Sequence, residues 1–304
     1  MQTGHPWRAA VGAVELALFA TVVIVWGASW LPLRLQLGVV APEVSGVWRF
    51  AIASAIMFAW TRLAGERLCF GFADHLRFMV LGTTLFSLNF LCAYYGGFYL
   101  AGGLLAVIFS LASVINPLLA AALGRGALDL RVLLGAALGL GGIALLFGPE
   151  IALTHASRET ALGLALAFAA TLSFCVGNMF SSAFQQGRMP VVPANAWGML
   201  YGTLLMALVA LVRGEPFIVE WSSRYLLSIA WLALPGTVLG FFAYVTLIGR
   251  IGPGRASYAT VLVPVVALAM STLFEQYQWT LAAALGVVFV LAGNAIVLTA
   301  SRRG

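Results

Sequence analysis

The segment LRVLLGAALGLGGIA (130–144) recurs 151 residues later as LAAALGVVFVLAGNA (281–295). The two copies are identical at six of fifteen positions, which in the first copy are Leu130, Leu134, Gly135, Leu140, Gly142 and Ala144. The shift is close to half of the 304 residues. It therefore predicts a chain built from two related halves, residues 1–152 and 153–304.

The composition places both halves in a membrane. Apolar residues make up 62% of the chain and charged residues 9%, whereas soluble domains have about 45–50% and about 25%. So few charges cannot cover a soluble surface, which excludes a cytosolic enzyme, a disordered chain and a secreted scaffold. The basic residues are all Arg and are scattered singly, so nucleic acid is not an expected partner.

Ten apolar runs are long enough to cross about 30 Å of hydrocarbon. They are 14–33, 44–61, 78–98, 103–123, 130–148, 160–182, 194–212, 226–248, 255–274 and 279–300. Backbone groups in lipid must be satisfied within a segment, so each run predicts an α-helix. Five is odd, so the two halves have opposite orientations. The expected fold is an all-α integral membrane protein of ten transmembrane helices in two inverted five-helix repeats.

The Arg residues predict the orientation of this bundle. Apart from Arg49, which lies well inside a run, eleven Arg fall on the side that holds both termini and four on the other side. The positive-inside rule then places both termini in the cytoplasm. We expect a multi-pass protein of a bacterial inner membrane.

Polar and aromatic residues inside the runs are candidates for function, because lipid makes polar groups costly. In several runs they recur every three or four residues and share one helix face. A wall that mixes aromatic and neutral polar groups suits a small amphipathic ligand. The predicted substrate-binding residues are Trp26, Ser29, Asn89, Tyr95, Tyr99, Ser110, Asn178, Phe241, Tyr244 and Thr260. The alternative for each is close helix packing, which polar and small residues also serve.

Three further residues are assigned a gating or structural role. Arg49 lies well inside a run, where it is placed to attract a carboxylate or, alternatively, to extend to the interface. Pro117 and Pro264 remove backbone donors and predict either hinges or static kinks. We favour gating for Pro264, because Gly252-Pro253-Gly254 precedes its run. The spacing of Gly135, Gly139 and Gly142 predicts close packing of helices.

Short motifs stand in order along the whole chain. They are Trp26-Gly27-Ala28-Ser29-Trp30 before Pro32, Pro42 with Arg49-Phe50, Gly254-Arg255-Ala256-Ser257 with Pro264 and Glu275, and Leu285-Gly286 with Ala292-Gly293. Their order and spacing resemble the EamA-type ten-helix exporters of the drug/metabolite transporter superfamily. One departure is Gly124, which stands where the repeat shift expects a glutamate. Within the family, the chain resembles YddG-type exporters of aromatic and other neutral amino acids.

The resemblance and the inverted repeat predict a secondary transporter. The leading interpretation is export of small, mostly neutral metabolites, above all amino acids including aromatic ones, by alternating access. Alternatives are export of drugs or of nucleoside and purine metabolites, and a membrane assembly protein without transport. We do not expect an enzyme, since no run offers a catalytic acid, base or metal site.

The expected partners are the small-molecule substrate and the lipid bilayer. We expect no cofactor and no metal, and a monomer as the transport unit. No carboxylate or His lies in the middle of a run, which predicts uniport rather than proton coupling.

Overall fold

The computed structural model describes residues 12–124, 129–153, 157–252, 256 and 258–300. All regular structure in these residues is helical. The first half contains α1 (Ala13–Leu35), α2 (Pro42–Leu63), α3 (Phe72–Thr83), η1 (Thr84–Leu88), α4 (Asn89–Gly96), α5 (Gly102–Phe109), α6 (Ala112–Ala122) and α7 (Leu130–Leu153). The second half contains α8 (Ser157–Gln186), α9 (Val191–Arg213), α10 (Ser223–Trp231), η2 (Leu232–Leu239), α11 (Gly240–Ile251), α13 (Tyr258–Phe274) and α14 (Leu281–Ala300).

Consecutive helices combine into ten spans. The elements α3, η1 and α4 form one span over Phe72–Gly96, α5 and α6 another over Gly102–Ala122, and α10, η2 and α11 a third over Ser223–Ile251. By length and composition, seven spans can cross a membrane, and α7, α13 and α14 contain shorter apolar stretches. The all-α, ten-helix prediction is confirmed. Four residues of the sequence motifs at the start of the ninth span lie outside the described residues: Pro253, Gly254, Arg255 and Ser257.

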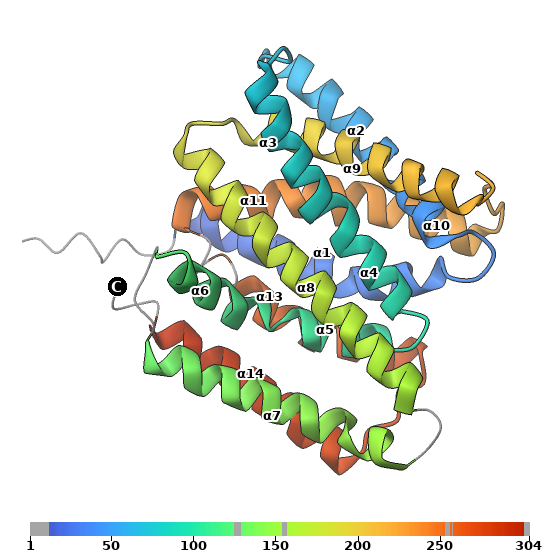
Figure 1. Ribbon diagram of the computed structural model, residues 1–304, viewed down its shortest axis with the longest axis vertical. Helices are drawn as coiled ribbons and strands as arrows, with labels where there is room; N and C mark the ends of the chain where they lie inside the picture. Colours follow the sequence, from blue (N-terminus) through green and yellow to red (C-terminus); the bar gives the residue numbers. More distant parts are fainter. Residues whose placement is uncertain (1–11, 125–128, 154–156, 253–255, 257, 301–304) are drawn as a thin grey trace, which may run out of the picture.

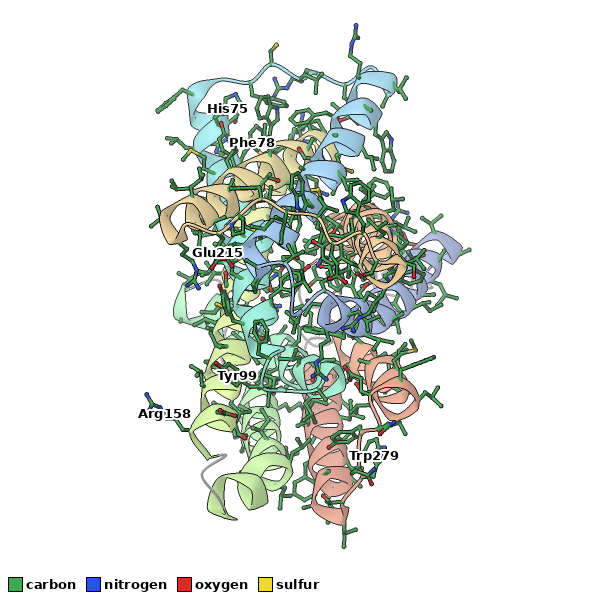
Figure 2. All side chains as sticks on the ribbon, turned by 90° about the vertical axis from the view of Figure 1, so that its right-hand side faces the viewer. His75, Phe78, Tyr99, Arg158, Glu215 and Trp279 are labelled. Carbon is green, nitrogen blue, oxygen red and sulfur yellow. The ribbon has the colours of Figure 1, made fainter. Side chains whose placement is uncertain are left out.

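The outer surface of the bundle is apolar. Large exposed side chains include Leu16, Ile24, Leu140, Leu208 and Val288, which come from four different spans. An apolar surface of this extent marks contact with another apolar phase, and here that phase is the lipid bilayer. Figure 2 shows side chains that project from the helices along both edges of the bundle in that view.

The repeated segments α7 and α14 pack against each other at one edge of the molecule (Figure 1). A Cβ atom on Gly135 would lie 2.7 Å from the carbonyl oxygen of Gly293, and one on Gly142 would lie 2.6 Å from that of Gly286. Under the repeat shift, Gly135 corresponds to Gly286 and Gly142 to Gly293. Each glycine therefore meets the counterpart of the other, as a two-fold relation requires. The predicted close packing through these glycines is confirmed.

Ion pairs at the helix ends agree with the ten-span order. Glu15, at the start of the first span, pairs with Arg250, at the end of the eighth. Arg34, at the end of the first span, pairs with Glu275, just after the ninth, at 2.9 Å. Each pair joins two ends that an alternating ten-span chain places on the same side. Each pair also connects the first half to the second.

The fourth span is interrupted between α5 and α6. Ser110 Oγ accepts a hydrogen bond from Asn294 Nδ2 at 2.9 Å, and Ser113 Oγ donates to Asn294 Oδ1 at 2.7 Å. Asn294 belongs to α14, so this interruption is fixed by a helix from the other half. Pro117 follows within α6 and supplies no backbone donor to its own turn.

Candidate substrate site

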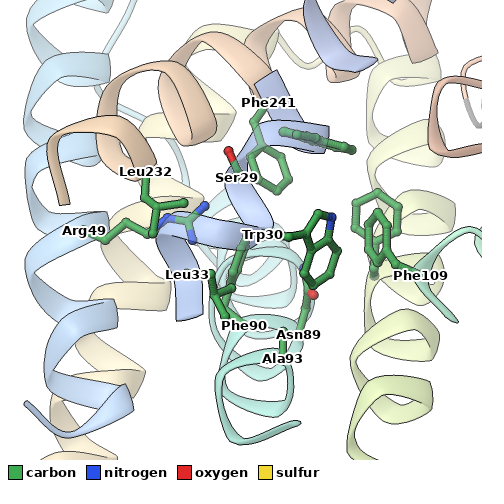
Figure 3. Close-up of a pocket in the computed structure, with 12 residues that line it drawn as sticks. Ser29, Trp30, Leu33, Arg49, Asn89, Phe90, Ala93, Phe109, Leu232 and Phe241 are labelled. Atoms are coloured by element: carbon green, nitrogen blue, oxygen red, sulfur yellow. The ribbon is translucent and has the colours of Figure 1, made fainter. Parts of the chain in front are cut away.

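A cavity of about 50 Å³ lies between the two halves (Figure 3). Helices α1, α2, α4 and α5 of the first half and α8, η2 and α11 of the second half form its wall. The lining residues are Trp26, Ser29, Trp30, Leu33, Arg49, Asn89, Phe90, Ala93, Phe109, Phe174, Leu232 and Phe241. Because both halves supply the wall, any movement of one half against the other changes the shape of the cavity.

Helix α1 presents one continuous face to the cavity. Trp26, Ser29, Trp30 and Leu33 are spaced by three and four residues, which places them on the same side of the helix. Trp26 Nε1 donates to the carbonyl oxygen of Gly236 at 3.1 Å, and Ser29 Oγ accepts from Trp231 Nε1 at 3.2 Å. These bonds hold α1 against the eighth span.

The third and eighth spans each contain a π-helical segment beside the cavity. A shift of 151 residues places η1 (Thr84–Leu88) onto residues 235–239 of η2. Pro235 lacks a backbone donor, and Thr237 Oγ1 donates to the carbonyl of Leu232, five residues back, at 2.7 Å. Wide turns of this kind are frequent at functional sites. The two halves therefore repeat this local distortion as well as their sequence.

Among the described residues that line the cavity, only Arg49 is charged, and it is buried, with 2% exposure. Its Nε donates to Thr237 Oγ1 at 2.8 Å. Its guanidinium carbon lies 4.2 Å from the centre of the Phe90 ring and 5.1 Å from that of Phe50. The side chain is thus buried within the bundle, and Figure 3 shows it among the other residues that line the cavity.

A layer of aromatic rings surrounds Trp26 and forms this part of the cavity wall. The Trp26 ring lies 4.8 Å from that of Tyr244 and 5.1 Å from that of Phe241. Phe109 and Phe174 pack together at 4.6 Å and both contact Trp26 edge-on. Pairs at these distances attract one another beyond their buried area.

Five predicted residues meet at the cavity: Trp26, Ser29, Arg49, Asn89 and Phe241. Two more lie directly behind it, since the Tyr244 ring packs at a tilted angle against Trp26 and its hydroxyl accepts a hydrogen bond from Asn178 Nδ2 at 3.3 Å. Their roles in substrate binding stay predictions.

The remaining predicted residues lie away from the cavity. Tyr95 donates to Glu43 at 2.8 Å, and Tyr99 is 38% exposed in the loop between α4 and α5 (Figure 2). Ser110 is bound to Asn294, and Thr260 is buried in α13. Pro117 and Pro264 lie inside α6 and α13, and neither lines the cavity.

The sequence analysis missed the apolar part of the wall: Trp30, Leu33, Phe90, Ala93, Phe109, Phe174 and Leu232. The predictions rest on polar and aromatic residues that recur on one helix face, and an apolar side chain that faces a cavity does not differ in type from one that faces lipid or a neighbouring helix. One signal was available on α1, where Trp30 and Leu33 continue the spacing of Trp26 and Ser29. Among the described residues, no group of three or more His, Cys, Asp or Glu is placed to hold a metal ion.

Comparison with known proteins agrees with this architecture. The profile of the EamA-like transporter family matches the chain twice, at residues 14–148 and 161–299. A probable amino-acid metabolite efflux pump of Escherichia coli K12 is 24% identical over 281 residues, which cover 90% of each chain. The uncharacterized transporter YoaV of Bacillus subtilis 168 is 21% identical over 274 residues, covering 90% of this chain and 92% of YoaV.

Two further similarities concern shorter or structural matches. Protein PecM of Dickeya dadantii 3937 is 27% identical over 223 residues, 73% of each chain. A crystal structure with 19% identity superposes with a TM-score of 0.70 and covers 95% of this chain and 99% of its own, which shows the same fold. With the family profile matched over most of its length, the chain belongs to the EamA-like transporter family.

Proposed function

We propose that this multi-pass membrane transporter exports small, mostly neutral metabolites, with amino acids, including aromatic ones, as the leading class. One observation carries the proposal: the cavity lies between the two halves and is walled mainly by aromatic rings. Flat rings with few polar groups suit a small ligand that has an apolar body and a polar end. The name of the relative from Escherichia coli, an amino-acid metabolite efflux pump, supports the same class.

The size and position of the cavity support alternating access. Its volume of about 50 Å³ is far below the roughly 300–1,000 Å³ of pockets that hold small molecules. The halves must therefore separate on one side before substrate enters, and the π-helical segments η1 and η2 supply matching places for such movement. Inverted repeats that rock around a central site are the general means of this cycle.

Uniport is the proposed energetic mode. No Asp, Glu or His lines the cavity, and Arg49 does not release its proton at accessible pH. Glu275 lies at the end of the ninth span, where it pairs with Arg34 and accepts a hydrogen bond from the backbone nitrogen of Gly102 at 3.1 Å. Those contacts give Glu275 a structural role as the partner of Arg34 and Gly102. We therefore propose that the substrate gradient alone drives flux.

We further propose that the protein lies in a bacterial inner membrane with both termini in the cytoplasm, and that one chain is the transport unit. The Arg distribution supports the orientation. The cavity is complete within a single chain, which supports a monomeric unit.

Counterflow in proteoliposomes tests the function. Vesicles loaded with an unlabelled compound are diluted into a trace of the same compound in labelled form, for a panel of amino acids, nucleosides, sugars and cationic drugs. We expect transient accumulation of labelled neutral amino acids and none in protein-free vesicles. Counterflow restricted to nucleosides or to cationic drugs would overturn the assignment to amino acids. A complete lack of counterflow across the panel would overturn transport of these compounds.

A further inference from the structure

One buried donor of the cavity wall has no acceptor. Arg49 Nη1 is inaccessible to solvent and has no hydrogen-bond partner, whereas Nε of the same side chain is bound to Thr237 at 2.8 Å. A buried donor attached to a charged group and left without an acceptor is costly. The Thr237 bond also limits rotation of the guanidinium, and the Arg49 side chain lines the cavity.

The charge of Arg49 also lacks a negative partner. Among the described residues, no ion pair includes Arg49. No residue of the cavity lining is acidic. An uncompensated charge inside a membrane protein is expensive, and such residues typically serve ion or substrate pathways. A ligand that brings a negative charge would remove this cost.

The surroundings of Arg49 indicate what else that ligand carries. Phe90 and Phe50 flank the guanidinium, and Trp30, Phe109 and Phe241 continue the wall beyond it. Aromatic faces attract a cation such as the guanidinium and also cover the apolar body of a ligand. The wall offers no carboxylate to an ammonium group and no second cation to a second anionic group.

Resting on the proposed function, we propose that Arg49 binds the carboxylate of the transported molecule and that the substrates are monocarboxylates with an apolar or aromatic body. The carboxylate accepts a charge-assisted hydrogen bond from Nη1. An α-ammonium group is tolerated but not recognised, so the same molecule without its amino group binds comparably. Dicarboxylates are rejected, because a second carboxylate would be buried without a partner. Compounds with net positive charge are rejected, because they would place a like charge beside the Arg49 guanidinium and bring no carboxylate to pair with it.

Competition against counterflow of labelled phenylalanine and labelled leucine tests this substrate class in the wild-type protein. The unlabelled competitors are phenylalanine, 3-phenylpropanoate and phenylalaninamide, which share one ring and differ in their charged groups. We expect the two carboxylates to compete within a few-fold of each other, and the amide to need about 10- to 100-fold more, as for loss of a charged hydrogen bond. Equal competition by the amide, or none by 3-phenylpropanoate, would overturn the inference while leaving transport established. Lack of counterflow by both labelled probes would overturn the proposed function and the inference with it.

Variants assign the effect to Arg49. Arg49→Gln should abolish the difference between acid and amide competitors, and Arg49→Lys, which keeps the charge, should retain part of it. The control is Arg224→Gln, since Arg224 is an exposed Arg whose side chain donates to the carbonyl of Leu35; it should preserve the full difference. If Arg49→Gln is not recovered as a monodisperse protein, Arg49→Lys and the wild-type competition decide. An unchanged acid preference in either Gln or Lys variant would contradict the role of Arg49.

Discussion

Two adjacent glycines of α7 provide a sharp test of the contact between the halves. An Ala Cβ at Gly142 would lie 2.6 Å from the backbone oxygen of Gly286, whereas one at Gly141 would meet no atom within 4 Å. Both positions belong to the same helix, so both substitutions gain the same intrinsic preference of Ala over Gly, about 1 kcal/mol. The two variants therefore differ only in what the added methyl group meets.

The expected magnitude follows from that distance. Ordinary contact begins near 3.4 Å, so Gly142→Ala must move α7 and α14 apart by roughly 0.8 Å, with loss of dispersion contacts along the interface. Inserting a methyl group into a well-packed interior costs about 1–3 kcal/mol. Gly142→Ala should therefore be about 1–3 kcal/mol less stable than Gly141→Ala, or several degrees in unfolding temperature.

Thermal unfolding in a mild detergent measures this difference, with the wild type and both variants scanned at the same protein concentration. Gly286→Ala should resemble Gly142→Ala, because a Cβ there lies 2.6 Å from the oxygen of Gly142. The double variant should cost less than the sum, since both changes act on one contact. If Gly142→Ala unfolds at the same temperature as Gly141→Ala, the glycine-mediated packing of the two repeats is wrong.

Three other predictions concern the cavity, energetics and topology. Trp26→Ala removes a ring that contacts four other rings and should raise the half-saturating phenylalanine concentration roughly tenfold. Trp279→Ala, at an exposed position, should leave that concentration unchanged, and equal values for the two variants would refute the role of the cavity in substrate binding. Glu275→Gln should lower the unfolding temperature by removing the pair with Arg34, yet neither it nor the wild type should concentrate substrate under an imposed pH gradient; accumulation that this variant abolishes would exclude uniport. A reporter fused after Gly304 should be active only in a form that works in the cytoplasm, and periplasmic activity there would reverse the orientation.

The helices were predictable because hydrocarbon thickness sets their length and apolar runs mark them. The ends of the helices were less predictable. Helix α8 extends over Ser157–Gln186, whereas the predicted run is 160–182, because a helix continues past the hydrocarbon into its polar flanking residues. The π-helical segments were not predicted. Pro235 lies in η2, but η1 has no proline, and five-residue turns otherwise leave no regular sequence signature.

The cavity was predictable only in part. Arg49 and Ser29 were found because a polar group inside an apolar run is unusual. Ser110 is also a polar residue inside an apolar run and was predicted to bind substrate. Its hydrogen-bond partner Asn294 lies in the other half of the chain, and the spacing of residues along one helix cannot reveal such a partner. The aromatic wall was missed for the opposite reason: Phe109 and Phe174 differ in no local feature from phenylalanines that face lipid.

The central claim is that substrate occupies the cavity between the halves, and protection of one cavity position from alkylation tests it directly. Ala93, which lines the cavity, is replaced by Cys in a protein whose Cys69, Cys92 and Cys175 are changed to Ala or Ser. Ser223→Cys, at the exposed start of α10, is the control. We predict that saturating phenylalanine slows maleimide modification at position 93 several-fold and leaves position 223 unchanged. Modification at position 93 that proceeds at the same rate with and without phenylalanine, in protein that shows phenylalanine counterflow, would contradict the account.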